Sequence, residues 1–482
     1  MKAIISGQGS QSQLENKSLS RQKALMFKQK HFPHTGQPSF FALVPFFVFI
    51  GTYVLLIALF PEASNDLKLT AFPTFAGILA VGFSLFTFQE RISISKKIKV
   101  FISGVAQPTV MYMCFIFIFS SIFSHIISLC GGVDSAIKLC YVLIPQQWML
   151  PGIFIAISLF SLTIGSSIGG IATFAPVAVG LAPKLGVSPA LMAGIAVSGS
   201  MLGDNLSVIS DTTIAVVHTT GCSPYKKFKS NAMLVFPAFV LTLIVLSIIN
   251  YNLPSPVTEQ VVTSWNISDV IKTIPYAAVF LLAILGIDVL IVLAIGAIAG
   301  AILGILYAKF SILLAITFFF EGFYQHKGVV AMLLLVMFIA GLSRIVEHNG
   351  GIKYLLRKFH ARTKTKTSAE CSIAMLVSLL DIAVARNTIA ILIAGPMARQ
   401  IGGRFKLKSA RIATLLDLFS CAIHGIIPYS SQLLLAAAMA GTTSISIIPY
   451  VHYQFIVLGV AILSIVKTKI SEGKKNVKKN RY

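Results

Sequence analysis

The sequence predicts an all-α polytopic membrane protein, built as an inverted repeat of five spans plus a re-entrant hairpin each, with discontinuous helices at the midplane. Of its 482 residues, 56% are hydrophobic and only 11% are charged, whereas about a quarter of the residues in soluble domains are charged. Apolar segments long enough to cross a bilayer alternate with short runs rich in Lys and Arg. In each half, two apolar stretches are interrupted by polar residues and glycine.

The charge distribution indicates a bilayer rather than a nucleic acid as the partner. The net charge is +23, but the Lys and Arg residues lie in short runs between apolar segments and not on one face. Such runs mark cytoplasmic loops, so both termini are expected on the cytoplasmic side. The membrane is expected to be the cytoplasmic (inner) membrane of a bacterium. The basic tail 1–38 lacks a signal-peptide core and is expected in the cytosol. The six cysteines form no C-x-x-C pair and predict neither a metal site nor a disulfide framework.

The first repeat, residues 39–251, divides into five spans and one hairpin. The spans are expected near 40–60, 69–89, 100–130, 188–220 and 232–251. Acidic Glu62 and Asp66 mark an external turn, Asp134 and Lys138 lie in an external connection, and the basic runs at 91–99 and 226–229 lie inside. The stretch 149–187 is apolar but broken at 163–170, without a strongly basic flank. It is therefore predicted to enter and leave from the outside.

An external linker, 252–272, which carries Glu259 and Asp269, leads to the second repeat, residues 273–466, and a basic cytosolic tail, 467–482, ends the chain. The spans of the second repeat are expected as two short helices within 273–307 that turn at Gly286 to Asp288, followed by 328–346, 411–441 and 447–466. Between two basic stretches lie about 32 residues, broken at 381–388, which are too few for two full spans. Because both flanks are cytoplasmic, this segment is predicted to be a second hairpin, the mirror of the first.

Residue identities support the repeat at an offset of 220. The pairs are Pro176 and Pro396, Ala190 and Ala410, Ser200 and Ser420, Asp204 and His424, and Ser210 and Ser430. The same offset superposes the two hairpin breaks and the two broken spans. Inverted repeats with paired discontinuous helices form midplane binding sites in many secondary transporters.

The segment 203–213 is the main candidate site, because it places polar side chains inside a long apolar stretch. Its candidate ligands for sodium are Asp204, Asn205, Ser207, Ser210, Asp211, Thr212 and Thr213. Sodium is a hard cation that takes several oxygen ligands, and a carboxylate that binds sodium or a proton, but not both, is the simplest exchanger. Asp211 is expected to carry the exchanged ion, with Asp204 as the next candidate. In the alternative, Asp204 caps the end of one half-helix and Asp211 the start of the next.

Further polar residues mark the hairpin tips and the second broken span. Ser166, Ser167, Asn387, Thr388 and Gln432 are candidate neutral ligands. Asp381 and Asp417 are either part of the site or paired internally with Arg386, and His424 is either a proton relay or a structural histidine.

Three strings carry a family resemblance. They are GDNLSVISDTTIA followed by TTGCSPYKKFKSN, ARNTIAILIAGPMARQI, and LLDLFSCAIHGIIPYSSQLLLAAAMAG. They resemble the NhaC-type sodium/proton antiporter family of the ion transporter superfamily, in the branch that also contains predicted amino-acid permeases. The resemblance implies transport driven by a sodium or proton gradient, with Asp204, Ser207, Ser210, Asp211 and Thr212 at the matching positions.

Two departures from that pattern bear on the substrate. Val208 stands where many members have proline, and Arg386 stands where an asparagine is expected. The leading interpretation is a sodium/proton antiporter working by alternating access. The alternative is a sodium- or proton-coupled transporter of an amino acid or small carboxylate, which Arg386 would hold through a bidentate pair.

Other function classes fit less well. An intramembrane aspartyl protease needs a Y-D motif that is missing beside Met201 to Asp204, so no enzyme is expected. Broken helices around a central site suit alternating access better than an open channel. No cofactor is expected beyond the transported sodium and protons, and the oligomeric state, a homodimer included, is left open.

Overall fold

The computed structural model describes residues 39–64, 67–87, 93–253, 266–308, 310–324, 327–360 and 365–479. The predicted N-terminal tail, most of the external linker, and the loop residues Asp66, Arg91 and Glu259 lie outside the described residues. Within the described ranges every regular element is a helix, and ten helices are long and apolar enough to cross a membrane. The chain is therefore an all-helical, multi-pass membrane protein.

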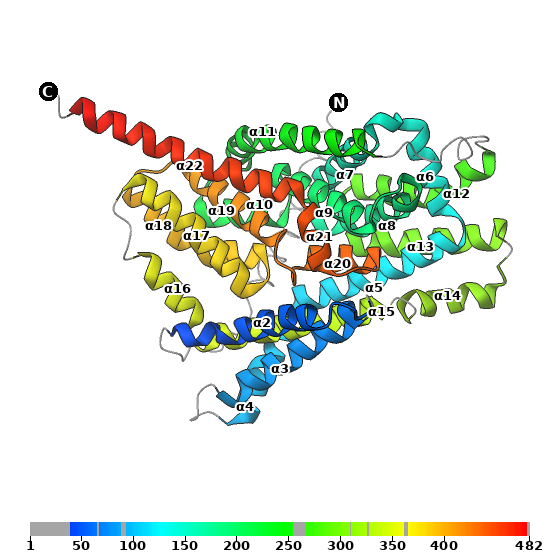
Figure 1. Cartoon of the computed structure of the whole chain (residues 1–482), viewed down its shortest axis with the longest axis horizontal. Coiled ribbons are helices and arrows are strands. Elements are labelled where there is room, and N and C mark those ends of the chain that lie inside the picture. Colours follow the sequence, from blue (N-terminus) through cyan, green and yellow to red (C-terminus); the bar gives the residue numbers. More distant parts are fainter. Residues whose placement is uncertain are drawn as a thin grey trace, which may run out of the picture.

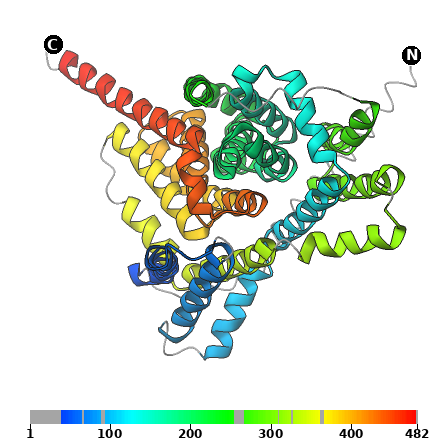
Figure 2. The ribbon, with the colours of Figure 1, turned by 45° about the vertical axis from the view of Figure 1, so that its right-hand side comes forward.

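The helices form two groups (Figures 1 and 2). One group comes from the beginning of each half and consists of α2 (Val44–Leu59), α3 (Phe72–Thr87), α4 (Ile94–Val105), α5 (Pro108–Leu129), α12 (Ile267–Ile284), α13 (Val289–Tyr307), α14 (Ile312–Tyr324), α15 (Lys327–His348) and α16 (Gly351–His360). In this group α5 packs against α13 and α14, while α15 packs against α3 and α4. α6 (Gly132–Leu143) contacts α12 as well as α8 of the second group.

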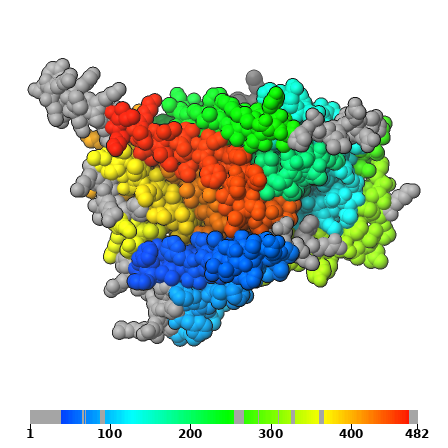
Figure 3. Space-filling view, viewed as in Figure 1, coloured from blue at the N-terminus to red at the C-terminus, as the bar shows by residue number. Residues whose placement is uncertain are grey.

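The second group contains both broken spans and both hairpins. Its first half consists of α7 (Met149–Ile164), α8 (Ser167–Leu185), α9 (Pro189–Leu206), α10 (Asp211–Thr220) and α11 (Pro224–Tyr251). Its second half consists of α17 (Lys366–Val384), α18 (Asn387–Arg404), α19 (Ser409–His424), α20 (Ser431–Ala440), α21 (Ser444–Ile447) and α22 (His452–Lys479). On the face drawn in Figure 3, residues of α20 to α22 lie between α2 and α11.

The offset of 220 residues relates the helix boundaries of these two halves. The first residues of α8 and α18, 167 and 387, differ by 220, and both ends of α10 and α20, 211–220 and 431–440, do the same. The turns at the two hairpin tips also match at this offset. Gly165 and Ala385 both adopt left-handed backbone conformations, with φ of 70° and 54°. Ser210 and Ser430 each cap the next helix by accepting a backbone N–H bond. The two halves thus use the same local structure at the predicted offset.

The half-helices pack crosswise between the two halves. α10, from the first half, packs against α18 and α19 of the second, and α20 packs against α8 and α9 of the first. Close packing around the first break depends on Gly203, where an added Cβ would lie 2.5 Å from the backbone atoms Ser158 O and Leu162 N of α7. The end of α9 also contacts the opposite half, because the side-chain amide of Asn205 donates to Tyr453 OH of α22.

Three details differ from the sequence-based prediction. The predicted span 100–130 is two helices, because Pro108 starts α5 and holds the preceding Gln107 in an extended conformation with ψ of 132°. The expected external connection with Asp134 and Lys138 is helical and forms α6. α14 was not predicted, since its 13 residues are fewer than the about 20 apolar residues that a membrane span needs.

Candidate functional site

Asp204 lies at the end of α9, where three predicted site residues meet. Asp204 is 5% exposed, and its carboxylate accepts a hydrogen bond from Ser167 Oγ at 3.3 Å. Ser167, in the first turn of α8, in turn accepts a hydrogen bond from Gln432 Nε2 at 3.1 Å. Gln432 belongs to α20, so the site joins a hairpin tip and a broken span of the first half to the broken span of the second.

The Asp204 carboxylate has no ion-pair partner among the residues that the structure describes. Lys227 acts on it electrostatically, but its ammonium nitrogen lies 2.8 Å from Asp417 Oδ2. A buried carboxylate without a counter-charge is costly. This position therefore favours a bound cation or a proton.

The break between α9 and α10 is held by hydroxyl groups. Ser210 Oγ accepts from Thr213 N at 3.2 Å and lies 3.1 Å from Thr212 Oγ1. Thr213 Oγ1 donates to the carbonyl of Ser207 at 2.7 Å. Ser210, and not Asp211, is therefore the cap of α10, so the alternative that gave Asp211 this role is wrong.

A buried polar cluster that the sequence did not predict surrounds the backbone of Asn205. The Asn205 carbonyl accepts from Lys227 Nζ at 3.0 Å and from Asn231 Nδ2 at 2.9 Å, and its side-chain amide donates to Tyr453 OH at 2.8 Å. Asn231 Nδ2 also donates to Asp417 Oδ2 at 2.6 Å.

The basic run at 226–229 predicts that Lys227 lies in a cytoplasmic loop. This prediction is wrong for Lys227, because its side chain is fully buried. Its neighbours in that run, Lys226 and Lys229, are exposed as expected. Because a run of lysines is usually solvated, the sequence does not reveal that one lysine of this run points into the protein.

A second buried acid, Asp381 of α17, pairs with His424 at the end of α19. Asp381 Oδ1 lies 3.1 Å from His424 Nδ1, and both side chains are at most 1% exposed. At the offset of 220, His424 corresponds to Asp204. Because Asp381 is paired with His424, and Asp417 with Lys227, the predicted internal pairing of Arg386 with either acid is wrong.

Arg386 instead lies near Asp211. This arginine, at the tip between α17 and α18, acts electrostatically on Asp211 in the first turn of α10. Its Nη1 atom is buried and has no hydrogen-bond partner among the described residues. Asp288 also acts electrostatically on Asp211, and it accepts a hydrogen bond from Tyr112 OH. The two predicted sodium carboxylates thus differ, because Asp204 is buried while Asp211 is exposed and shares the field of an arginine.

The remaining predicted ligands make contacts that do not involve Asp204. Asn387 Nδ2 lies 3.8 Å from Cys421 Sγ, and Asn387 Oδ1 accepts from Thr388 N at 2.9 Å. Ser166 Oγ caps α8 by accepting from Gly169 N at 3.1 Å. None of these contacts reaches Asp204, so they support the hairpin tips rather than the carboxylate itself.

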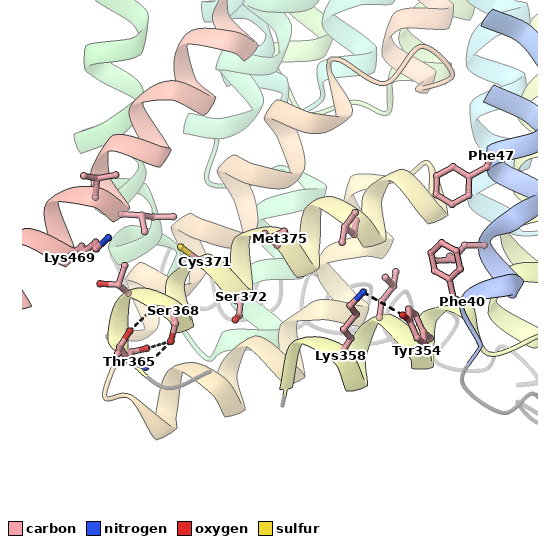
Figure 4. Close-up of a pocket in the computed structure, with 16 residues that line it drawn as sticks. Phe40, Phe47, Tyr354, Lys358, Thr365, Ser368, Cys371, Ser372, Met375 and Lys469 are labelled. Carbon is pink, nitrogen blue, oxygen red and sulfur yellow. Dashed lines mark hydrogen bonds between the residues drawn. The ribbon is translucent and has the colours of Figure 1, made fainter. Parts of the chain in front are cut away.

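A groove of about 1070 Å³ lies away from both breaks, between the N-terminal helices, α16, α17 and α22 (Figure 4). Its lining is mostly apolar, with Phe40, Phe47 and Met375 beside Lys358 and Lys469. None of its described lining residues is acidic, so these residues lack the chemistry expected of a sodium site.

Comparisons with known proteins confirm the predicted resemblance. Residues 38–253 match the family described as "Na+/H+ antiporter family". The chain is 22% identical to the malate-2H(+)/Na(+)-lactate antiporter of Bacillus subtilis, over 77% of this chain and 79% of that protein. It is 23% identical to the Na(+)/H(+) antiporter NhaC of the same organism, over 66% of this chain and 76% of the relative.

A similar solved structure is the YdaH transporter of Alcanivorax borkumensis. It aligns with a TM-score of 0.40 at 14% identity, covering 88% of this chain and 98% of that one.

Proposed function

For a chain whose resemblance to the NhaC-type sodium/proton antiporter family is thus confirmed, we propose sodium/proton antiport by alternating access, with Asp204 as the carboxylate that binds either ion. The observation that carries this proposal is the burial of Asp204 without an ion-pair partner among the residues that the structure describes. Sodium would take oxygen ligands from Asp204 and Ser167 and from Gln432 of the opposite half. A proton neutralises the same carboxylate, so the two ions compete for one site.

The inverted repeat and the re-entrant hairpins belong to this proposal. The shared helix boundaries and the crosswise packing of α10 and α20 support two halves of related structure. Opposite membrane orientation of these halves would bring the hairpin tips to the midplane from opposite sides. Both termini would then lie on the cytoplasmic side of a bacterial inner membrane, as the basic loops indicate.

Thiol labelling is expected to show opposite access to the two tips. Thr163→Cys, close to the first break and exposed, should react with a membrane-impermeant reagent from outside. Thr388→Cys, at the second tip, should react only from the cytoplasmic side. Both are made in a background without the six native cysteines, and reaction of both from the same side would rule out the inverted arrangement.

Asp211→Asn is expected to retain sodium-dependent proton movement, although the sequence alone favoured this residue as the exchanger. Asp211 is exposed and Arg386 acts on it electrostatically, whereas Asp204 is enclosed by protein, which makes Asp204 the better candidate for the exchange. The assay is exchange in proteoliposomes, followed with a pH-sensitive dye. Loss of exchange in Asp211→Asn, together with normal exchange in Asp204→Asn, would transfer the exchange site to Asp211.

A second candidate function is sodium- or proton-coupled transport of an organic carboxylate. One observation favours it: Arg386, at the tip of a hairpin, has a buried guanidinium nitrogen that finds no hydrogen-bond partner in the described ranges. A guanidinium matches a carboxylate in shape and charge. The relative named as a malate-2H(+)/Na(+)-lactate antiporter carries such anions according to its name.

A further inference from the structure

Lys227 is a lysine buried completely within the membrane-spanning group of helices. Its ammonium nitrogen contacts three oxygen atoms, Asp417 Oδ2 at 2.8 Å, Asn205 O at 3.0 Å and Thr213 Oγ1 at 2.7 Å. The side chains of Lys227 and Asp417 are both 0% exposed. Burying an ammonium group costs several kcal/mol unless its surroundings compensate the charge, so these oxygens must be arranged for a cation.

The three oxygens have the character of ligands for a hard monovalent cation. They are a carboxylate, a backbone carbonyl and a hydroxyl, and they come from α19, the end of α9 and the start of α10. The carbonyl of Asn205 is available because the helix stops there: the amide of Ile209, which would bond to it in a continuous helix, bonds to Ser207 Oγ instead. Freed carbonyls at broken helices bind alkali ions in transporters.

The same cluster holds more acceptors than its donors satisfy. Asn205 Oδ1, Asn231 Oδ1 and Asp417 Oδ1 are buried and have no hydrogen-bond partner within the described part of the chain. Buried acceptors without donors are rare and costly. Their presence around a single ammonium group shows that the cluster favours positive charge beyond what a simple ion pair requires.

We propose that this cluster is a monovalent-cation site that the chain fills with its own Lys227 ammonium group. The tethered ammonium then takes the place of one free sodium ion. It holds the end of α9 and the start of α10 together at every stage of transport. This inference extends the proposed function, because it leaves Asp204 as the site open to exchange. It concerns binding and stability, so it can be tested without measuring transport.

The test is sodium binding to purified protein in which the ammonium group has been removed. Lys227→Ala opens the space of the lysine side chain while Asp417 keeps its charge, so we expect one additional sodium ion bound per protein. Sodium, but not choline, should also raise the unfolding midpoint of this variant more than that of the parent. Lys227→Gln, which retains a hydrogen-bond donor and changes the volume less, should show the same dependence on sodium.

Two controls separate a cation site from an ordinary ion pair. Lys227→Met fills the space with an apolar chain and should gain no sodium. Lys227→Ala combined with Asp417→Asn should lose the additional ion. Unchanged sodium stoichiometry in both Lys227→Ala and Lys227→Gln, or failure of both to fold in sodium, would overturn the proposal. The parent protein tests the proposed function separately, because its own sodium binding depends on Asp204.

Discussion

Sodium-dependent proton movement is expected to vanish in Asp204→Asn. An amide keeps the size of the carboxylate and its bond to Ser167, but it can neither attract sodium nor release a proton near neutral pH. A charged carboxylate at this depth costs about 3 kcal/mol on insertion scales. Among the described residues Asp204 has no ion-pair partner that would offset this cost, as expected if ion binding offsets it.

The measurement uses proteoliposomes with a pH-sensitive dye, to which sodium is added on one side. Asp134→Asn is the matched control, because Asp134 is an acid with a side chain 69% exposed and 3.4 Å from Lys184, and it should exchange like the parent. Equal unfolding midpoints for the parent and Asp204→Asn would establish that the fold is intact. Normal exchange by a folded Asp204→Asn protein would remove Asp204 from the mechanism.

The broken helices were predictable from the sequence because hydrocarbon penalises polar groups so strongly. Asp204, Ser207 and Ser210 stand inside an apolar stretch, which has to be covered by protein and interrupted there. The structure places that interruption between Leu206 and Asp211, within the predicted segment. The offset of 220 was predictable because matching residues, such as Ser210 and Ser430, stand in both interrupted stretches.

The partners of the buried charges were not predictable. Lys227 appears in the sequence as one of three lysines in a short run, and only the packing of α11 against α9 and α19 shows that it alone turns inward. The pairing of Asp381 with His424 joins residues 43 positions apart on two helices. Such contacts depend on how helices are rotated about their axes, which hydropathy patterns do not report.

The last prediction concerns Arg386 and separates the two candidate functions. If the transported anion is an organic carboxylate, Arg386→Gln should abolish its uptake while sodium binding at Asp204 persists. Removing one partner of a buried, hydrogen-bonded charge pair costs about 2–5 kcal/mol, which corresponds to a loss of affinity of at least about 30-fold. Arg386→Lys keeps the charge but loses the bidentate geometry, so we expect an intermediate loss.

The matched control is Arg399→Gln, in α18, which begins directly after Arg386; Arg399 is exposed and its replacement should transport like the parent. The assay compares sodium alone with sodium plus a panel of small carboxylates and amino acids in the same vesicles. If the protein exchanges only sodium and protons, no organic solute will alter proton movement. Arg386→Gln will then change the dependence of exchange on pH, and only through Asp211, on which Arg386 acts electrostatically. Replacing both Arg386 and Asp211 should restore the parental dependence of exchange on pH. Parental behaviour of Arg386→Gln in both assays would contradict both roles, because an arginine that neutralises Asp211 or binds an anion cannot be removed without effect.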